Sequence, residues 1–193
     1  MKQSTKLPLW FLGAALLTAL TIIAHELAHY VAAIVMRAEN VKLHWADITF
    51  TENSLNSTGL AVTWIAGPLL THGIIVWVWL SKRTDLLALA LGLGACSRNL
   101  VLLPFTIKFL FGRDVSTFTN DEVTVAEALG ISPIGFAVVA VLLGVGGTIV
   151  FLKRAYASNG VLFPIALLLG TIAGIILWGT AGPALLPGGK GFE

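Results

Sequence analysis

The stretch TIIAHELAHYVAAIV, residues 21–35, places His25, Glu26 and His29 inside a run of apolar residues. The run covers residues 7–36, and at about 1.5 Å per residue it predicts a tilted helix long enough to cross a membrane. Each ionisable side chain near the middle of a bilayer costs at least about 2.5 kcal/mol on insertion scales. These three neighbouring side chains therefore need a partner that compensates for their burial.

The composition predicts an integral membrane protein. Of the 193 residues, 56% are hydrophobic and 11% are charged, whereas soluble domains carry roughly 25% charged residues. We expect one membrane domain over residues 1–193, with a core over 7–135 and two further helices within 133–182. The net charge of +2 is small and spread out, so the lipid bilayer is an expected partner and nucleic acid is not. The lone Cys96 excludes an intramolecular disulfide and a cysteine-cluster metal site.

Four further apolar segments complete an all-α polytopic protein with about five transmembrane helices. They cover 61–80, 85–111 with a kink at Pro104, 133–152 and 161–180. Gly170 and Gly174 form a small-xxx-small pair that permits close helix contact. A signal peptide is the alternative interpretation of the first run, which follows Lys2 and Lys6, but its apolar region would be only about 7–15 residues.

Shorter features connect the predicted spans. VKLHW at 41–45 and LAVTW at 60–64 alternate in period two, which predicts strands, and the polar residues 51–59 between them suit a turn. We therefore expect a small β-hairpin at the membrane surface after the first helix. Asn120 or Thr119 can cap a short helix over the sequence DEVTVAEAL.

Five spans place successive connections on alternate sides of the membrane. The hairpin, the loop 112–132 and the C-terminus then share one side, opposite the N-terminus. The N-terminal side carries six basic residues and the opposite side five: Lys2, Lys6, Lys82, Arg83, Lys153 and Arg154 against Arg37, Lys42, Lys108, Arg113 and Lys190. From this small excess we expect a multi-pass protein of the cell membrane with a cytoplasmic N-terminus.

The spacing of the buried polar residues predicts a metal site. His25 and His29 are four residues apart, so their side chains share one helix face and can bind one Zn²⁺ at about 2.0–2.1 Å. Glu26, one residue on, lies beside the metal and can take a proton from a water molecule there. One alternative is a set of buried polar residues satisfied by neighbouring helices. Another is a di-iron membrane desaturase or hydroxylase, which needs many histidines, but this chain has four, and His44 and His72 are isolated.

HELAH inside a predicted span resembles the site-2 protease family of intramembrane zinc metalloproteases, peptidase family M50. In that family a β-hairpin follows, and then a helix with a Gly-Pro motif, which Gly67 and Pro68 match. Thr71 stands where the family usually has Asn, and no Leu-Asp-Gly follows the loosely similar RNLVLLP. The closer resemblance is to the compact M50B-like branch, because NDEVTVAEALGISP at 120–133 is similar to a segment after that branch's third span. The resemblance covers about residues 20–135 and implies a protease with one Zn²⁺ per chain.

A third metal ligand is expected, because a catalytic zinc usually has three protein ligands and one open position. The loop 112–132 lies on the side nearest HELAH and contains Asp114 and Asp121; the resemblance selects Asp121. Asp114 and His72 remain alternatives. The other candidates are polar residues of the hairpin: His44, Asp47 and Glu52.

Arg98 is another charge in an apolar segment. It can pair with an acid near the site, stabilise charge on a substrate, or form a structural ion pair or a snorkelling side chain. Its neighbour Asn99 can hold the substrate backbone or form a hydrogen bond between helices.

The sequence thus predicts an intramembrane zinc endopeptidase that hydrolyses peptide bonds in or near transmembrane segments of other proteins. Its metal ligands would be His25, His29 and Asp121, and its catalytic base Glu26. The alternative is a zinc-binding membrane scaffold or chaperone without proteolytic activity, which does not need Glu26 as a base. The sequence specifies neither the substrate nor the oligomeric state.

Overall fold

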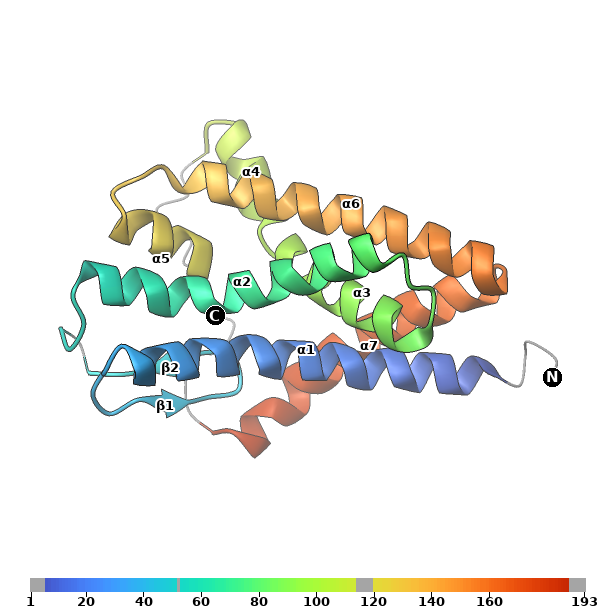
Figure 1. The fold of residues 1–193 in the computed structure, drawn as a ribbon, viewed down its shortest axis with the longest axis horizontal. Helices are drawn as coiled ribbons and strands as arrows, with labels where there is room; N and C mark the ends of the chain where they lie inside the picture. The colour runs from blue at the N-terminus through green and yellow to red at the C-terminus, as the bar shows by residue number, and fades with distance from the viewer. Residues whose placement is uncertain (1–5, 52, 114–119, 188–193) are drawn as a thin grey trace.

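The fold is a bundle of helices with one small hairpin (Figure 1). The computed structural model describes residues 6–51, 53–113 and 120–187. Its elements are α1 (Leu7–Val35), β1 (Lys42–Leu43), β2 (Ile48–Thr49), α2 (Ser57–Ser81), α3 (Leu86–Leu100), α4 (Leu103–Leu110), α5 (Asp121–Ala128), α6 (Pro133–Asn159) and α7 (Leu162–Leu185). Five residues named above lie outside the described ranges: Lys2, Glu52, Asp114, Thr119 and Lys190.

The prediction of an all-α polytopic protein with five spans is confirmed. The helices α1, α2, α6 and α7, and the segment formed by α3 and α4, are each long and apolar enough to cross a membrane. Large apolar side chains lie exposed at helical spacing on α1, where Leu12, Leu16 and Leu20 are 57%, 58% and 54% exposed. Such a surface suits lipid, which is as apolar as leucine.

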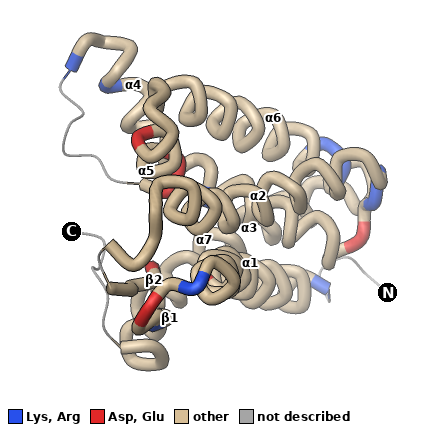
Figure 2. Tube along the Cα trace, turned by 60° about the vertical axis from the view of Figure 1, so that its left-hand side comes forward, with Lys and Arg blue, Asp and Glu red and all other residues tan. Residues whose placement is uncertain are grey.

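The connections alternate between the two ends of the bundle, as the sequence predicts. The hairpin, α5 and the end of α7 lie at one end, and the start of α1 lies at the other with the turns after α2 and α6 (Figure 1). Charged residues gather mainly towards these two ends (Figure 2). The cytoplasmic placement of the N-terminus stays a prediction.

Polar side chains begin several helices. The N-caps are Asn56 of α2, Asp85 of α3 and Asn120 of α5, and their side-chain oxygens accept backbone N–H bonds at 2.8, 3.0 and 3.3 Å. The predicted cap at Asn120 is therefore confirmed. The expected kink near Pro104 is a break between α3 and α4, with the proline in the first turn of α4, where its missing N–H costs nothing.

The second predicted strand, residues 60–64, is wrong, because these residues belong to α2. β1 instead pairs with β2, which lies just before the residues 51–59 expected to form the turn, and the His44 N–H donates to the Asp47 carbonyl at the tip (2.9 Å). In the misread segment Ala61 and Thr63 are buried while Val62 faces outward. A membrane helix turns small residues towards its neighbours and large ones towards lipid. The alternation of small and large residues at 60–64 therefore resembled the alternating pattern of a strand.

The polar segment at residues 152–160, expected as a connection, is also helical, since α6 continues to Asn159. Arg154 lies in this extension and donates to the carbonyl oxygens of Val78 and Trp79, both at 2.8 Å. These carbonyls belong to the last turn of α2, where intrahelical partners run out. The polar residues therefore tie α6 to the end of α2.

Small residues let α7 pack directly on α1, as the pair at Gly170 and Gly174 predicts. A Cβ at Gly170 would meet the Phe11 carbonyl oxygen, and one at Gly174 would meet the Ala15 carbonyl oxygen. Backbone atoms cannot move aside as a flexible side chain can. The two helices therefore touch along this seam, which fixes α7 beside the face of α1 that carries the polar group.

We predict that Gly174→Ala destabilises the fold. The added methyl group overpacks the seam, so the free energy of unfolding should fall by about 1–3 kcal/mol. Denaturant unfolding in detergent micelles, followed by circular dichroism, measures this change. Gly179→Ala on the same helix is the matched control, since no described atom lies within 4 Å of a Cβ there. Equal effects of the two substitutions would contradict a tight seam.

Candidate metal centre

Three side chains from two helices converge in the bundle. His25 and His29 lie one above the other on α1, and Asp121 is the first residue of α5. The His25 Nε2 atom lies 2.8 Å from Asp121 Oδ2 and 3.1 Å from His29 Nε2, and His29 Nε2 lies 3.3 Å from Asp121 Oδ2. Ligand atoms about 2.0–2.1 Å from a tetrahedral metal ion are separated by roughly 3.3 Å. The group can therefore hold a metal ion with little rearrangement.

The protonation of His29 also suits a metal ligand. Its Nδ1 lies 2.8 Å from the carbonyl oxygen of Thr63, which can only accept, so Nδ1–H is the donor. Nε2 is then the ring atom that faces the carboxylate of Asp121, and in a neutral ring it would offer its lone pair to a metal ion. A backbone carbonyl behind a histidine is a common support for a metal ligand.

The start of α5 delivers an ionised carboxylate. Burial alone would raise the pKa of Asp121, but the hydrogen-bonded rings of His25 and His29 and the positive charge of Arg98 hold it well below its usual value. Burial, with the adjacent charge of Asp121, instead raises the pKa of Glu122 to about 7. Near neutral pH, Asp121 is thus the fully ionised carboxylate of this turn, as a metal ligand must be.

The Gly67–Pro68 pair of α2 gives the histidine rings their space. A Cβ at Gly67 would meet Nε2 of both His25 and His29, the two atoms of the metal group. Proline lacks an N–H, so Pro68 leaves the carbonyl four residues earlier, that of Trp64, without its helical donor. The Thr63 carbonyl that supports His29 is the one before it in the helix. The sequence showed this pair only as part of a family motif, and the structure supplies its physical role.

Glu26 and Arg98 lie beside the metal group and outside it. Arg98 Nη2 is 3.1 Å from Asp121 Oδ2, 3.3 Å from His25 Nε2 and 3.5 Å from Glu26 Oε1. The expected pairing of Arg98 with acids near the site is therefore present. Both side chains are largely buried, at 5% exposed for Glu26 and 17% for Arg98.

A side cavity of about 60 Å³ opens next to the metal group, between α1, α3, α7 and the hairpin. Its volume exceeds the roughly 10–15 Å³ that one water molecule requires. Among the described residues, Glu26 and Arg98 are the charged members of its lining, and the rest are Ile22, Ala46, Ser97, Val101, Ile175, Trp178 and Gly179. A carboxylate and a guanidinium that both lie beside the potential metal group therefore line one largely apolar cavity.

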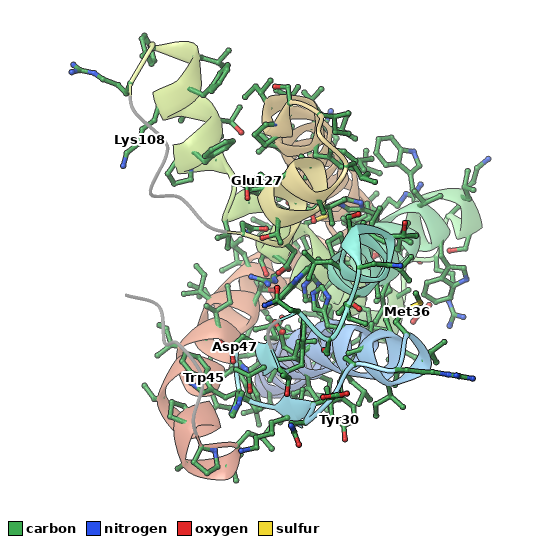
Figure 3. All side chains as sticks on the ribbon, turned by 90° about the vertical axis from the view of Figure 1, so that its left-hand side faces the viewer. Tyr30, Met36, Trp45, Asp47, Lys108 and Glu127 are labelled. Carbon is green, nitrogen blue, oxygen red and sulfur yellow. The ribbon has the colours of Figure 1, made fainter. Side chains whose placement is uncertain are left out.

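The hairpin and α5 flank this end of the bundle. Figure 3 looks down the bundle from that end and labels Trp45 and Asp47 on the hairpin and Glu127 on α5. Trp178 of α7 donates to the Trp45 carbonyl oxygen at 2.7 Å, which fixes the hairpin to α7. Backbone acceptors such as those of Thr63 and Trp45 carry no side-chain signal, so the sequence could not reveal them.

Among the described residues, the candidates His72 and His44 lie outside the metal group. His72 is partly buried on α2, and its Nε2 has no hydrogen-bond partner in the described part of the chain. His44 lies in the hairpin, within hydrogen-bond distance of Pro187 O and Thr49 Oγ1. Asn99 forms the expected contact between helices, since its amide donates to the Ala140 carbonyl at 3.1 Å.

Comparison with known proteins does not identify this arrangement. No protein-family model matches the chain, and no curated protein or solved structure shows a significant match to it. The resemblance to the site-2 protease family therefore stays a prediction.

We predict that the metal depends on all three converging side chains. His25→Ala, His29→Ala and Asp121→Ala should each reduce bound metal from about one ion per chain to a small fraction, because each removes a bond to the ion. Elemental analysis of purified, dialysed protein measures this. His72→Ala is the control and should keep its metal. Full occupancy in Asp121→Ala would exclude the carboxylate as a ligand.

We also predict that Gly67→Ala weakens metal binding without removing a ligand. Its methyl group would displace both ring nitrogens, and disturbing such a supporting position typically costs about 10–100-fold in metal affinity. Competition with a chelator of known affinity gives the dissociation constant. Gly73→Ala is the matched control on the same helix, because no described atom lies within 4 Å of a Cβ there. Unchanged affinity in Gly67→Ala would contradict the contact.

Proposed function

We propose that the protein is an intramembrane zinc endopeptidase that hydrolyses peptide bonds in or near transmembrane segments of membrane proteins. One observation carries the proposal. His25, His29 and Asp121 converge within ligand distances, and Glu26 lines a cavity directly beside them. The resemblance of HELAH and of residues 120–133 to the site-2 protease family supports the same activity.

The donor set favours zinc. Two imidazoles and one carboxylate are a common set in catalytic zinc sites, which keep one coordination position open. The same set also binds Fe(II) in oxygenases, but a carboxylate base next to the metal is what hydrolysis requires. Bound zinc would act as a Lewis acid that polarises the scissile carbonyl and makes water acidic.

Glu26 is proposed as the general base. It lies on α1 next to His25, but it is not part of the converging metal group, so its carboxylate stays available for proton transfer. It would accept a proton from the attacking water and return it to the leaving amine. A scaffold or chaperone would have no use for a carboxylate at this cavity, so the position of Glu26 favours an enzyme.

The depth of the centre favours a substrate within the membrane. His25 lies ten residues before the end of α1, about 15 Å along a helix, and a bilayer has a hydrocarbon core of about 30 Å. A transmembrane substrate reaches this depth, but its helix hides the peptide groups in internal hydrogen bonds. The substrate therefore has to be extended locally before its carbonyl can approach Glu26.

We predict that Glu26→Gln separates catalysis from metal binding. The amide keeps the size of the side chain and removes its basicity, so cleavage should fall by about 10²–10⁴-fold. Metal content and thermal stability should stay at the wild-type level. Cleavage of a co-expressed panel of transmembrane substrates, read by immunoblot, measures the activity.

The result separates the two candidate functions. Normal cleavage by Glu26→Gln would exclude this mechanism. The scaffold would instead be favoured if the wild-type protein binds metal and membrane segments but cleaves none of the panel, and if the Glu26→Gln substitution leaves its cellular function intact.

A further inference from the structure

Arg98 is a permanent cation in a membrane span, and it is neither a metal ligand nor a general base. Its guanidinium contacts Asp121 and Glu26 and approaches His25 to 3.3 Å. At this distance it repels any divalent ion bound to the same residues. A buried ion pair is weak support for stability, because desolvation offsets most of the Coulomb attraction. The position therefore points to a chemical role.

The guanidinium has donor capacity to spare. Arginine carries five N–H donors, and the contacts to Asp121, Glu26 and His25 all involve Nη2. The Nε atom is buried and has no hydrogen-bond partner among the described residues. Since Arg98 and Glu26 line the same cavity, the guanidinium lies beside the space that a bound group next to Glu26 would occupy.

We propose that Arg98 is a catalytic residue that stabilises the oxyanion of peptide hydrolysis, an inference that rests on the proposed function. The water oxygen forms a bond to the carbonyl carbon while Glu26 accepts the water proton. The π electron pair of the carbonyl moves onto its oxygen, whose negative charge accepts hydrogen bonds from Arg98. The C–N bond then breaks, its electron pair stays on nitrogen, and Glu26 returns the proton, which gives one carboxylic acid and one amine.

The charges of the site fit this role. Glu26 and Asp121 carry two negative charges and Arg98 one positive charge, so these three groups sum to −1, and a divalent ion would raise the total to +1. A site with this excess favours the anionic transition state over the neutral peptide. Fixed donors in a cavity shielded from water are the usual way in which enzymes obtain this preference.

The lining of the cavity limits what can flank the scissile bond. Apart from Glu26, Arg98 and Ser97, the residues that line the cavity are apolar or small, and Trp178 lines it next to the hairpin. We therefore expect apolar side chains on the residues that enter it. The probe for the test is accordingly a peptide of apolar residues, paired with a phosphinic analogue whose tetrahedral anionic phosphinate replaces the scissile amide.

The test compares Arg98→Gln with wild type in cleavage, inhibitor binding and metal content. Loss of one oxyanion donor typically costs about 10²–10³-fold in kcat, so kcat should fall at least about 100-fold, with KM changed only a few-fold. Affinity for the phosphinic peptide should fall by the same factor as kcat/KM, while affinity for the uncleaved peptide stays constant. Metal content should not change. Arg113→Gln, at an exposed position, is the matched control.

The outcomes distinguish this inference from the proposed function. Wild-type kcat in Arg98→Gln, with Glu26→Gln inactive, would overturn the role of Arg98 alone. Loss of metal or of the fold in parallel with activity would show a structural role and also overturn it. If Arg98→Gln does not fold, Arg98→Lys is the second variant, because lysine keeps the charge and lacks the planar fork of N–H donors. Wild-type kcat in Arg98→Lys overturns the inference, and a loss of about 10-fold in kcat with full metal content supports it. Activity in Glu26→Gln would remove both proposals.

Discussion

Charge compensation within an apolar layer is the constraint on which the rest of this structure depends. Glu26 and Arg98 lie on membrane-spanning helices, and Asp121 reaches them from α5, which packs on α2 and α6. Bringing such groups out of water costs several kcal/mol each unless partners are close. The contacts of 3.1 and 3.5 Å made by Arg98, and the ring nitrogens around Asp121, supply those partners. The start of α5 is thus held against the bundle by ionic contacts as well as by packing.

Much of this arrangement follows from sequence spacing. Two histidines four residues apart must share a helix face, and the two spans between the hairpin and α5 must bring α5 back to the end that carries the hairpin. Those two facts, with the resemblance to a protease family, were enough to nominate Asp121. The cap at Asn120 also has a strong local signal, because few side chains can accept bonds from the first N–H groups of a helix.

The wrong assignment of residues 60–64 to a strand has a physical cause. In water, alternation of apolar and polar residues reports which face is buried, but in lipid both faces are apolar. Residues 60–64 were therefore misread as a strand, although Asn56 already caps the helix that contains them. The partners made of backbone were invisible for another reason. Every residue has a carbonyl, so nothing in the sequence marks Thr63 as the support of His29 or Trp45 as the partner of Trp178.

The glycine seam between α1 and α7 has a mechanical consequence. It lies at Phe11 to Ala15 of α1, whereas the side cavity lies between Ile22 and Glu26 of α1 and Ile175 to Gly179 of α7. The two helices thus touch at the seam, towards the start of α1, and the cavity lies between the parts of the helices that are nearer the hairpin. A separation of the two helices beside the cavity would pivot about this seam, and the hairpin would either move with α7 or lose the bond from Trp178 to Trp45. A wider cavity at the hairpin end would then require no loss of contact at the glycine seam.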